Sequence, residues 1–144
     1  MDLRPSILDD LGILATVGWF TREFQKIYAH LSIAKEIQIE ENEIPVSLRT
    51  VLFRVMQEAL NNVAKHSKAD LVHLSLKRIE NSIELGIRDN GQGFDLDEIF
   101  SVGRSEKGMG ISSMRERVEL SGGSFAIESN PGSGTTIRVS FTHP

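Results

Sequence analysis

Residues 72–94 read VHLSLKRIENSIELGIRDNGQGF, and the apolar side chains in this stretch alternate with polar ones. A period of two is typical of β-strands with one buried face. Glu80, Asn81 and Ser82 separate the two alternating segments and predict a hairpin turn. The stretch therefore predicts an antiparallel strand pair that carries Asp89 to the edge of a glycine-rich loop.

The segment before this hairpin has the period of a helix. Ser47 is a suitable N-cap, and apolar residues follow it at steps of three and four as far as about His66. Residues 35–40 alternate between apolar and polar and predict a short strand that ends before Pro45. A strand and a helix are therefore expected ahead of the hairpin.

Nearer the N-terminus, apolar residues recur at steps of three and four between Leu3 and Leu31. This pattern predicts one long amphipathic helix with Pro5 in its first turn. The apolar stripe of this helix either packs on the chain's own domain or belongs to a helical bundle or dimer stalk. We expect a domain boundary near residue 32, which divides the chain into residues 1–31 and 32–144.

Beyond the hairpin, residues 90–110 contain five glycines, which predicts a loop with a short helix near residues 96–100. A helix over residues 111–120 and strands over residues 124–128 and 136–141 are expected to follow. The element order predicts an α+β fold, a two-layer sandwich with helices on one face of a mixed, mostly antiparallel sheet.

The composition excludes several classes of function. Sixteen Lys and Arg residues against twenty Asp and Glu residues give the 144-residue chain a formal net charge of -4. We therefore expect contact with neither nucleic acid nor membrane. The chain has no cysteine, which excludes a thiolate nucleophile and a disulfide framework. The longest uncharged apolar run is too short to span a membrane and no signal peptide is visible, so a cytoplasmic location is expected.

Three polar side chains near the end of the second helix share a predicted face. Glu58, Asn62 and Lys65 stand at positions i, i+4 and i+7, so they project toward a common side. Their groups suit a Mg²⁺-polyphosphate, because the carboxylate and amide oxygens bind the metal and the ammonium group faces phosphate. A solvated helix face is the alternative interpretation.

Asp89 lies where the second hairpin strand ends, close in sequence to Gly91 and Gly93. A carboxylate in this position can accept a hydrogen bond from an exocyclic amine, while the glycines leave room for a flat base. Thr135 opens the last strand with a hydroxyl that can join Asp89. An ordinary Asp-Asn-Gly turn and an ordinary strand start are the alternatives.

Gly108 and Gly110 stand immediately before the helix expected from residue 111. Glycines at a helix N-terminus expose backbone N–H groups and the positive end of the helix dipole, which together favour phosphate. Loop flexibility is the alternative interpretation. The four histidines show no spacing typical of metal ligands.

These motifs occur in one order that resembles a known family. QEALNNVAKHSKA (57–69), DNGQGF (89–94), GMGISSMRERV (108–118) and PGSGTTIRVSF (131–141) resemble the boxes of the GHKL ATP-binding superfamily. Within it, they look like a sensor histidine kinase of the subgroup that partners NarL-type response regulators. The resemblance covers residues 47–141, and DLRPSILDDLGI (2–13) resembles the end of the dimerisation and phosphotransfer domain of that subgroup.

The resemblance implies the Bergerat ATP-binding fold, with ATP and Mg²⁺ as ligands. On the phosphate side, Asn62 would bind Mg²⁺, and Glu58 would order the metal or act as a base. Lys65 and His66 would approach the phosphates. These implied roles extend the interpretation of the helix face to a catalytic site.

On the adenine side, the resemblance implies that Asp89 accepts a hydrogen bond from the adenine amine. Gly91 and Gly93 would shape the pocket, and Thr135 would support Asp89 through water. Two further glycines, Gly108 and Gly110, would hinge and cradle a short lid between residues 95 and 110.

The reaction implied is transfer of the ATP γ-phosphoryl group to a histidine, and then onward to a response regulator. None of the four histidines here has the acidic neighbour that marks the acceptor in this subgroup. We therefore expect a catalytic portion that binds ATP without phosphorylating itself and works on a separate histidine-bearing dimerisation domain. The parent kinase is expected to be a homodimer. The alternatives are a serine kinase of the anti-sigma-factor kind and a nucleotide-binding module without kinase activity.

Overall fold

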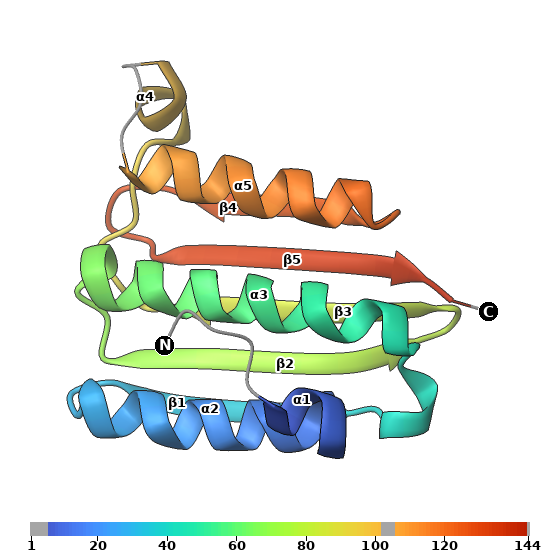
Figure 1. Cartoon of the computed structure of the whole chain (residues 1–144). Helices are drawn as coiled ribbons and strands as arrows, with labels where there is room; N and C mark the ends of the chain where they lie inside the picture. Colours follow the sequence, from blue (N-terminus) through green and yellow to red (C-terminus); the bar gives the residue numbers. More distant parts are fainter. Residues whose placement is uncertain (1–5, 102–105, 144) are drawn as a thin grey trace.

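The computed structural model describes residues 6–101 and 106–143, in which helices cover one face of a five-stranded sheet (Figure 1). The strand order is β1-β2-β3-β5-β4; β1 pairs with β2 in parallel, and the other pairs are antiparallel. The predicted α+β class and mixed sheet are confirmed. The strands are β1 (Ser32–Gln38), β2 (Leu71–Ile79), β3 (Ser82–Asp89), β4 (Ser124–Ser129) and β5 (Thr135–Thr142).

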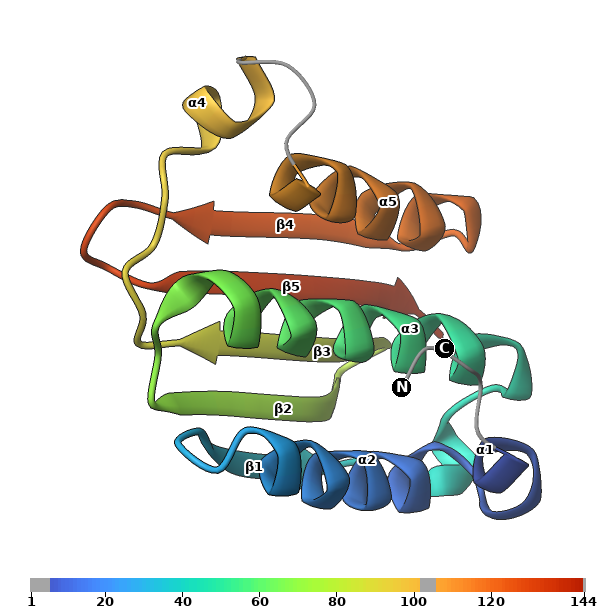
Figure 2. The ribbon, with the colours of Figure 1, turned by 60° about the vertical axis from the view of Figure 1, so that its left-hand side comes forward.

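Three long helices form the second layer. The views in Figures 1 and 2 agree that α2, α3 and α5 lie side by side over the sheet, whereas α4 lies beyond its β4 edge. The helices are α1 (Ser6–Leu11), α2 (Ile13–Ile27), α3 (Val46–Asn62), α4 (Leu96–Ser101) and α5 (Glu106–Leu120), with a 3-10 turn η1 (Glu41–Glu43) and a π-helical turn η2 (Val63–Ser67).

The β2–β3 hairpin forms as the alternating sequence predicts. Leu74 and Leu76 of β2 are buried, and they stand opposite Ile87 and Leu85 of β3 in the antiparallel register. Side chains at opposed positions project from the same face of a sheet, so these pairs form one apolar surface beneath the helices. The hairpin therefore provides the floor of the core.

The prediction of a single helix between Leu3 and Leu31 is wrong. Residues 6–27 form two helices that meet at Gly12. Gly12 has a positive φ of 91°, and Glu41 caps the new helix start by accepting a hydrogen bond from the Leu14 N–H at 2.9 Å. This cap comes from a residue 27 positions away in sequence, so local periodicity does not reveal it.

The apolar stripe of α2 packs on the chain's own domain, which was one of the two expectations for it. Phe20 and Phe24 are buried, and the ring of Phe20 meets the ring of Phe53 on α3 edge-on with centroids 5.5 Å apart. Aromatic pairs in this geometry contribute about 0.5–1.5 kcal/mol beyond burial of their area. The division of the chain at residue 32 stays a prediction.

Helix α5 begins at Glu106, five residues before the predicted start at Ile111, so Gly108 and Gly110 lie inside it. We expected residues 90–110 to hold no regular element beyond a short helix, and this prediction is wrong for residues 106–110, which form the start of α5. Gly110 lies against α3, where an added Cβ would collide with the Glu58 carboxylate. Close packing of the two helices outweighs the low helix propensity of glycine here.

Candidate functional site

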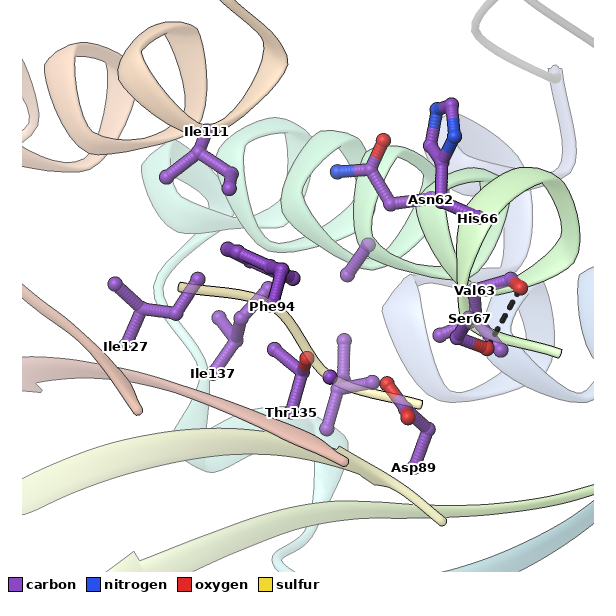
Figure 3. Close-up of a pocket in the computed structure, with 13 residues that line it drawn as sticks. Asn62, Val63, His66, Ser67, Asp89, Phe94, Ile111, Ile127, Thr135 and Ile137 are labelled. Carbon is purple, nitrogen blue, oxygen red and sulfur yellow. Dashed lines mark hydrogen bonds between the residues drawn. The ribbon is translucent and has the colours of Figure 1, made fainter. Parts of the chain in front are cut away.

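A pocket opens between the end of the sheet and the helices α3 and α5 (Figure 3). The space between the lining atoms amounts to about 450 Å³, part of which is open to solvent. Most of its wall is apolar, with a few polar groups at defined points. The lining residues are Ala59, Asn62, Val63, His66, Ser67, Ile87, Asp89, Gly93, Phe94, Ile111, Ile127, Thr135 and Ile137.

Asp89 is the principal charged group in the pocket wall. It is the last residue of β3 and only 6% exposed, and its Oδ1 accepts a hydrogen bond from the Gly91 N–H at 2.8 Å. Thr135 of β5 stands directly opposite Asp89 in the antiparallel register and also lines the pocket. The pair places a carboxylate and a hydroxyl side by side at one end of an apolar cavity.

The loop after Asp89 packs so closely on neighbouring segments that its backbone meets their backbone directly. An added Cβ at Gly91 would collide with the Ser67 carbonyl, and one at Gly93 would collide with the Asn130 carbonyl. Gly93 also has a positive φ of 65°, a conformation that glycine adopts without strain. The glycines are therefore required by the close packing of three segments, and the pocket wall at this point is backbone.

Gln92 ties this loop to its surroundings. Its N–H donates to the Ser67 carbonyl at 2.6 Å, and its own carbonyl accepts from the Gly132 N–H at 2.6 Å. Its side-chain amide donates to the His66 carbonyl at 2.7 Å. The loop is thus fastened on both sides, to the turn after α3 and to the turn between β4 and β5.

The C-terminal end of α3 provides the other polar groups of the pocket. Asn62 and His66 line it, as Figure 3 shows, whereas Lys65 is exposed and lies outside the lining. The α-helix ends at Asn62 and continues as the π-helical turn η2. A π-helix has i→i+5 hydrogen bonds and more residues in each turn than an α-helix. A step of three residues therefore rotates the side chain through a smaller angle about the helix axis. Lys65 therefore falls short of the face that carries Asn62.

Glu58 lies one turn before Asn62 and faces Gly110 on α5. It lines a second, more polar cleft between α3 and α5 together with Arg54, Gln57, Ser113, Met114 and Arg117. The structure therefore divides the predicted helix face: Asn62 lies in the apolar pocket, Glu58 in the adjoining cleft, and Lys65 in neither.

The two glycines of α5 have different surroundings. Gly110, the fifth residue of the helix, packs against Glu58, whereas Gly108 lines a shallow cleft beside Phe100 and Met109. Only the first four N–H groups of an α-helix lack an intrahelical acceptor, so the Gly110 N–H belongs to the helical ladder. The middle of the lid expected over residues 95–110 falls on residues 102–105, outside the described part of the chain.

Some residues of the site had no predicted role. Phe94 follows Gly93 directly, and its ring lies in the middle of the pocket between Ile111 and Ile137 in Figure 3. Ser129, the last residue of β4, is 6% exposed and hydrogen-bonds to the Thr135 hydroxyl behind the pocket wall. The position of Phe94 within the glycine motif was a usable signal, whereas nothing local in sequence distinguishes Ser129.

Among the described residues, no three His, Cys, Asp or Glu side chains gather into a group that could hold a metal by themselves. The oxygen donors of Asn62 and Glu58, one turn apart on α3, nevertheless suit Mg²⁺. This ion takes one or two protein oxygens and fills its remaining positions with water and substrate phosphates. Asn62, which lines the pocket, would supply the protein oxygen to a magnesium ion that arrives with a polyphosphate, and Glu58 would act from the adjoining cleft.

The fold and this pocket define an α+β domain with a small-molecule site at one end of its sheet. Residues 47–144 match the family model described as histidine kinase-, DNA gyrase B- and HSP90-like ATPase. The chain belongs to this family of ATPases.

Relatives similar to the chain are sensor histidine kinases. It is 36% identical over 139 residues to the signal transduction histidine-protein kinase/phosphatase DegS of Brevibacillus brevis, which covers 96% of this chain and 34% of DegS. It is also 36% identical over 142 residues to the oxygen sensor histidine kinase NreB of Staphylococcus carnosus, covering 96% of this chain and 39% of NreB. The chain thus spans a little over a third of the length of these relatives.

Solved histidine kinase structures share the fold. The histidine kinase domain of the blue-light activated kinase EL346 from Erythrobacter litoralis superimposes with a TM-score of 0.69 at 18% identity, over 89% of this chain and 59% of that domain. The mycobacterial sensor histidine kinase MprB gives a TM-score of 0.63 at 20% identity, over 86% of this chain and 90% of that one.

Within residues 6–101 and 106–143, none of the helices has the length and apolar character needed to cross a membrane.

Proposed function

We propose that this chain is the ATP-binding catalytic portion of a two-component sensor histidine kinase, and that it transfers the ATP γ-phosphoryl group to a histidine on another segment. The observation that carries the proposal is the buried Asp89 carboxylate beside Thr135 at one end of an apolar pocket, with the Asn62 amide at the other. A flat apolar base with an amine edge and a charged tail has this distribution of chemistry.

The proposal gives the two ends of the pocket different tasks. We call Asp89, Gly91, Gly93 and Thr135 the base end. Asp89 accepts a hydrogen bond from the adenine amine, and Thr135 supports that contact from the neighbouring strand. The backbone packing of Gly91 and Gly93 keeps the slot open for a flat ring.

We call Glu58, Asn62, Lys65 and His66 the phosphate end. The amide oxygen of Asn62 would hold the magnesium ion, and Glu58 would order that ion or take the proton of the attacking group. His66 lines the pocket and Lys65 is exposed outside the lining, so His66 would approach the phosphates more directly. Gly110 packs against Glu58 and allows the close approach of α5 to this end, and Gly108 lies nearer the start of the same helix.

The chemistry is governed by positioning and charge neutralisation. Bound magnesium would offset the negative charge that develops on the phosphoryl oxygens. Asn62 and Glu58 would orient the polyphosphate for attack by the acceptor. An imidazole nitrogen of the acceptor attacks that phosphorus, and ADP leaves. The phosphohistidine then supplies a response regulator.

The test has two stages. Calorimetric titration of Mg-ATP measures binding, and γ-labelled ATP is then supplied with and without a separate helical domain that carries an acceptor histidine. We expect ATP binding, no acid-labile phosphohistidine on the chain alone, and labelling of the added domain. Stable phosphohistidine on the chain itself contradicts the proposal, as does a failure to bind ATP. Labelling of serine in a partner instead supports the serine-kinase alternative.

A further inference from the structure

The polar cleft between α3 and α5 adjoins the phosphate end and carries an arginine on each helix. The space between its lining atoms amounts to about 830 Å³, part of which is open to solvent. Neither arginine lines the apolar pocket. The lining residues of the cleft are Arg54, Gln57 and Glu58 of α3 and Ser113, Met114 and Arg117 of α5.

The cleft leads away from the phosphate end along both helices. Glu58 meets Gly110 at its near end, whereas Arg54 lies one turn before Glu58 and Arg117 lies two turns after Gly110. The two helices therefore run in opposite directions along the cleft, as Figure 1 shows, and the arginines lie at its far end. Arg54 is two turns from Asn62, or about 12 Å along the helix. Helical side chains lean toward the N-terminus, so Arg54 leans away from a phosphate held at Asn62.

The far end of the cleft has an oriented positive charge. Gln57 is only 6% exposed, and its Oε1 accepts a hydrogen bond from Arg54 Nη1 at 3.0 Å, which fixes the direction of that guanidinium group. Arg117 is exposed, and no ion pair joins it to Glu58 or to another side chain in the described part of the chain. The acid at the near end therefore leaves the charge of Arg117 available to a partner.

The chemistry of this far end suits a carboxylate. A guanidinium group donates parallel hydrogen bonds to both oxygens of a carboxylate, and two such groups on facing helices can hold one acid between them. Glu58 repels a second acid at the near end, so the favourable position lies between Arg54 and Arg117. A protein segment along the cleft can thus place an acid at the far end and a reacting group at the near end.

We propose that Arg54 and Arg117, which we call the arginine pair, dock the acceptor by binding an aspartate or glutamate that lies two turns from the reacting histidine on the same helix. This inference rests on the proposed function, because it takes the acceptor to be a helix whose histidine reaches the phosphoryl group at the phosphate end. Two turns of helix span about 11 Å, which matches the separation of Arg54 from Asn62 along α3. The arginine pair aligns the acceptor and leaves nucleotide binding unchanged.

Phosphotransfer kinetics separate docking from nucleotide binding. With saturating γ-labelled Mg-ATP, the labelling rate is measured against the concentration of the separate helical acceptor domain. Arg117→Gln should raise the KM for the acceptor about threefold to tenfold, with kcat and the Kd for Mg-ATP unchanged. Arg54→Lys keeps the charge but loses the planar fork, so it should raise this KM by a smaller factor.

Arg115→Gln is the matched control for Arg117→Gln. It removes the same charge from the same helix, but Arg115 lies outside the cleft, with its guanidinium 5.3 Å from the ring centroid of Phe125. The KM for the acceptor should therefore stay at the wild-type value. An equal rise in KM for Arg115→Gln and Arg117→Gln would show a general effect of charge and overturn the inference.

A charge swap identifies the acid on the acceptor. Each Asp and Glu of the acceptor helix is changed to Lys and assayed with Arg117→Glu, and the change two turns from the histidine should restore part of the lost rate. Restoration at no such position, an unchanged KM in Arg117→Gln, or weaker Mg-ATP binding in that variant overturns the inference while the proposed function stands. Failure of the wild-type chain to label the acceptor domain instead defeats the proposed function, and this inference with it.

Discussion

The base end and the phosphate end of the pocket are built in different ways. At the base end, backbone groups of the loop, the turn after α3 and the β4–β5 turn are joined by short hydrogen bonds, such as Gln92 N–H to Ser67 O at 2.6 Å. At the phosphate end, the functional groups are side chains on successive turns of one helix and its π-helical extension. Substitutions of the packed loop glycines at the base end should therefore disturb stability and affinity together, whereas substitutions of the side chains at the phosphate end should disturb affinity alone.

Asn62→Ala should have the largest effect on function, at the phosphate end. Loss of the amide oxygen removes a magnesium ligand, so the gain in ATP affinity from Mg²⁺ and all phosphotransfer should disappear, while metal-free ADP still binds. Stability should hold, because alanine is a better helix former than asparagine. Titrations with and without Mg²⁺ measure this, with Asn61→Ala on the same helix but outside the pocket lining as the control. If Mg²⁺ raises the ATP affinity of Asn62→Ala as much as it raises that of the wild type, Asn62 is not a magnesium ligand.

Gly93→Ala should have the largest effect on folding, at the base end. The new Cβ meets the Asn130 carbonyl in a backbone conformation that already disfavours alanine. We expect a loss of about 3 kcal/mol in the free energy of unfolding, together with weaker ATP binding. Gly132→Ala is the matched control: it has a positive φ of 83° but open space around it, so it should cost only about 1 kcal/mol. Equal losses in the two variants, measured by denaturant unfolding, would refute the contrast between packed and open glycines.

Asp89→Asn tests the chemistry of the base end with little change in shape. The amide presents a donor where the carboxylate offered only acceptors, and the resulting mismatch costs about 1–3 kcal/mol. ATP affinity should fall roughly tenfold, while the melting temperature of the free protein moves little. Glu128→Gln makes the same chemical change at an exposed position and should leave the affinity unaltered. Undiminished affinity in Asp89→Asn would take this carboxylate out of the site.

Lys65→Ala should have the smallest effect. The ammonium group is exposed and outside the pocket lining, and exposed charge interactions contribute about 0.2–1 kcal/mol in water. We expect ATP affinity to fall by about threefold or less at low salt and by less still at high salt. A loss as large as that of Asn62→Ala would show that Lys65 turns into the pocket when nucleotide binds.

The elements that hold the base end could be predicted from sequence. The alternation of Leu74 and Leu76 with polar residues predicted the hairpin, and the hairpin prediction put Asp89 at the end of a strand, where the structure has it. Both signals are local, since they depend only on the period of the side chains along the strand. Thr135 opposite Asp89 followed from the resemblance and agrees with the observed register.

The features that sequence did not reveal depend on contacts between distant segments. Glu41 of η1 caps the helix that starts after the break at Gly12, and the early first turn of α5 carries Gly110 close to Glu58 on α3. The exposure of Lys65 follows from a π-helical turn in place of a regular α-helix. Ser129 alternates in its strand like any other residue, and only its partners on neighbouring segments make it distinct.

The central claim is that adenine lies at the base end with its amine on Asp89, and an experimental structure of the complex with ADP tests it most directly. The account predicts the exocyclic amine within about 3 Å of an Asp89 carboxylate oxygen, the ring between Phe94 and the glycine loop, and the phosphates beside Asn62. A base bound away from Asp89, or phosphates at the base end, would contradict the account.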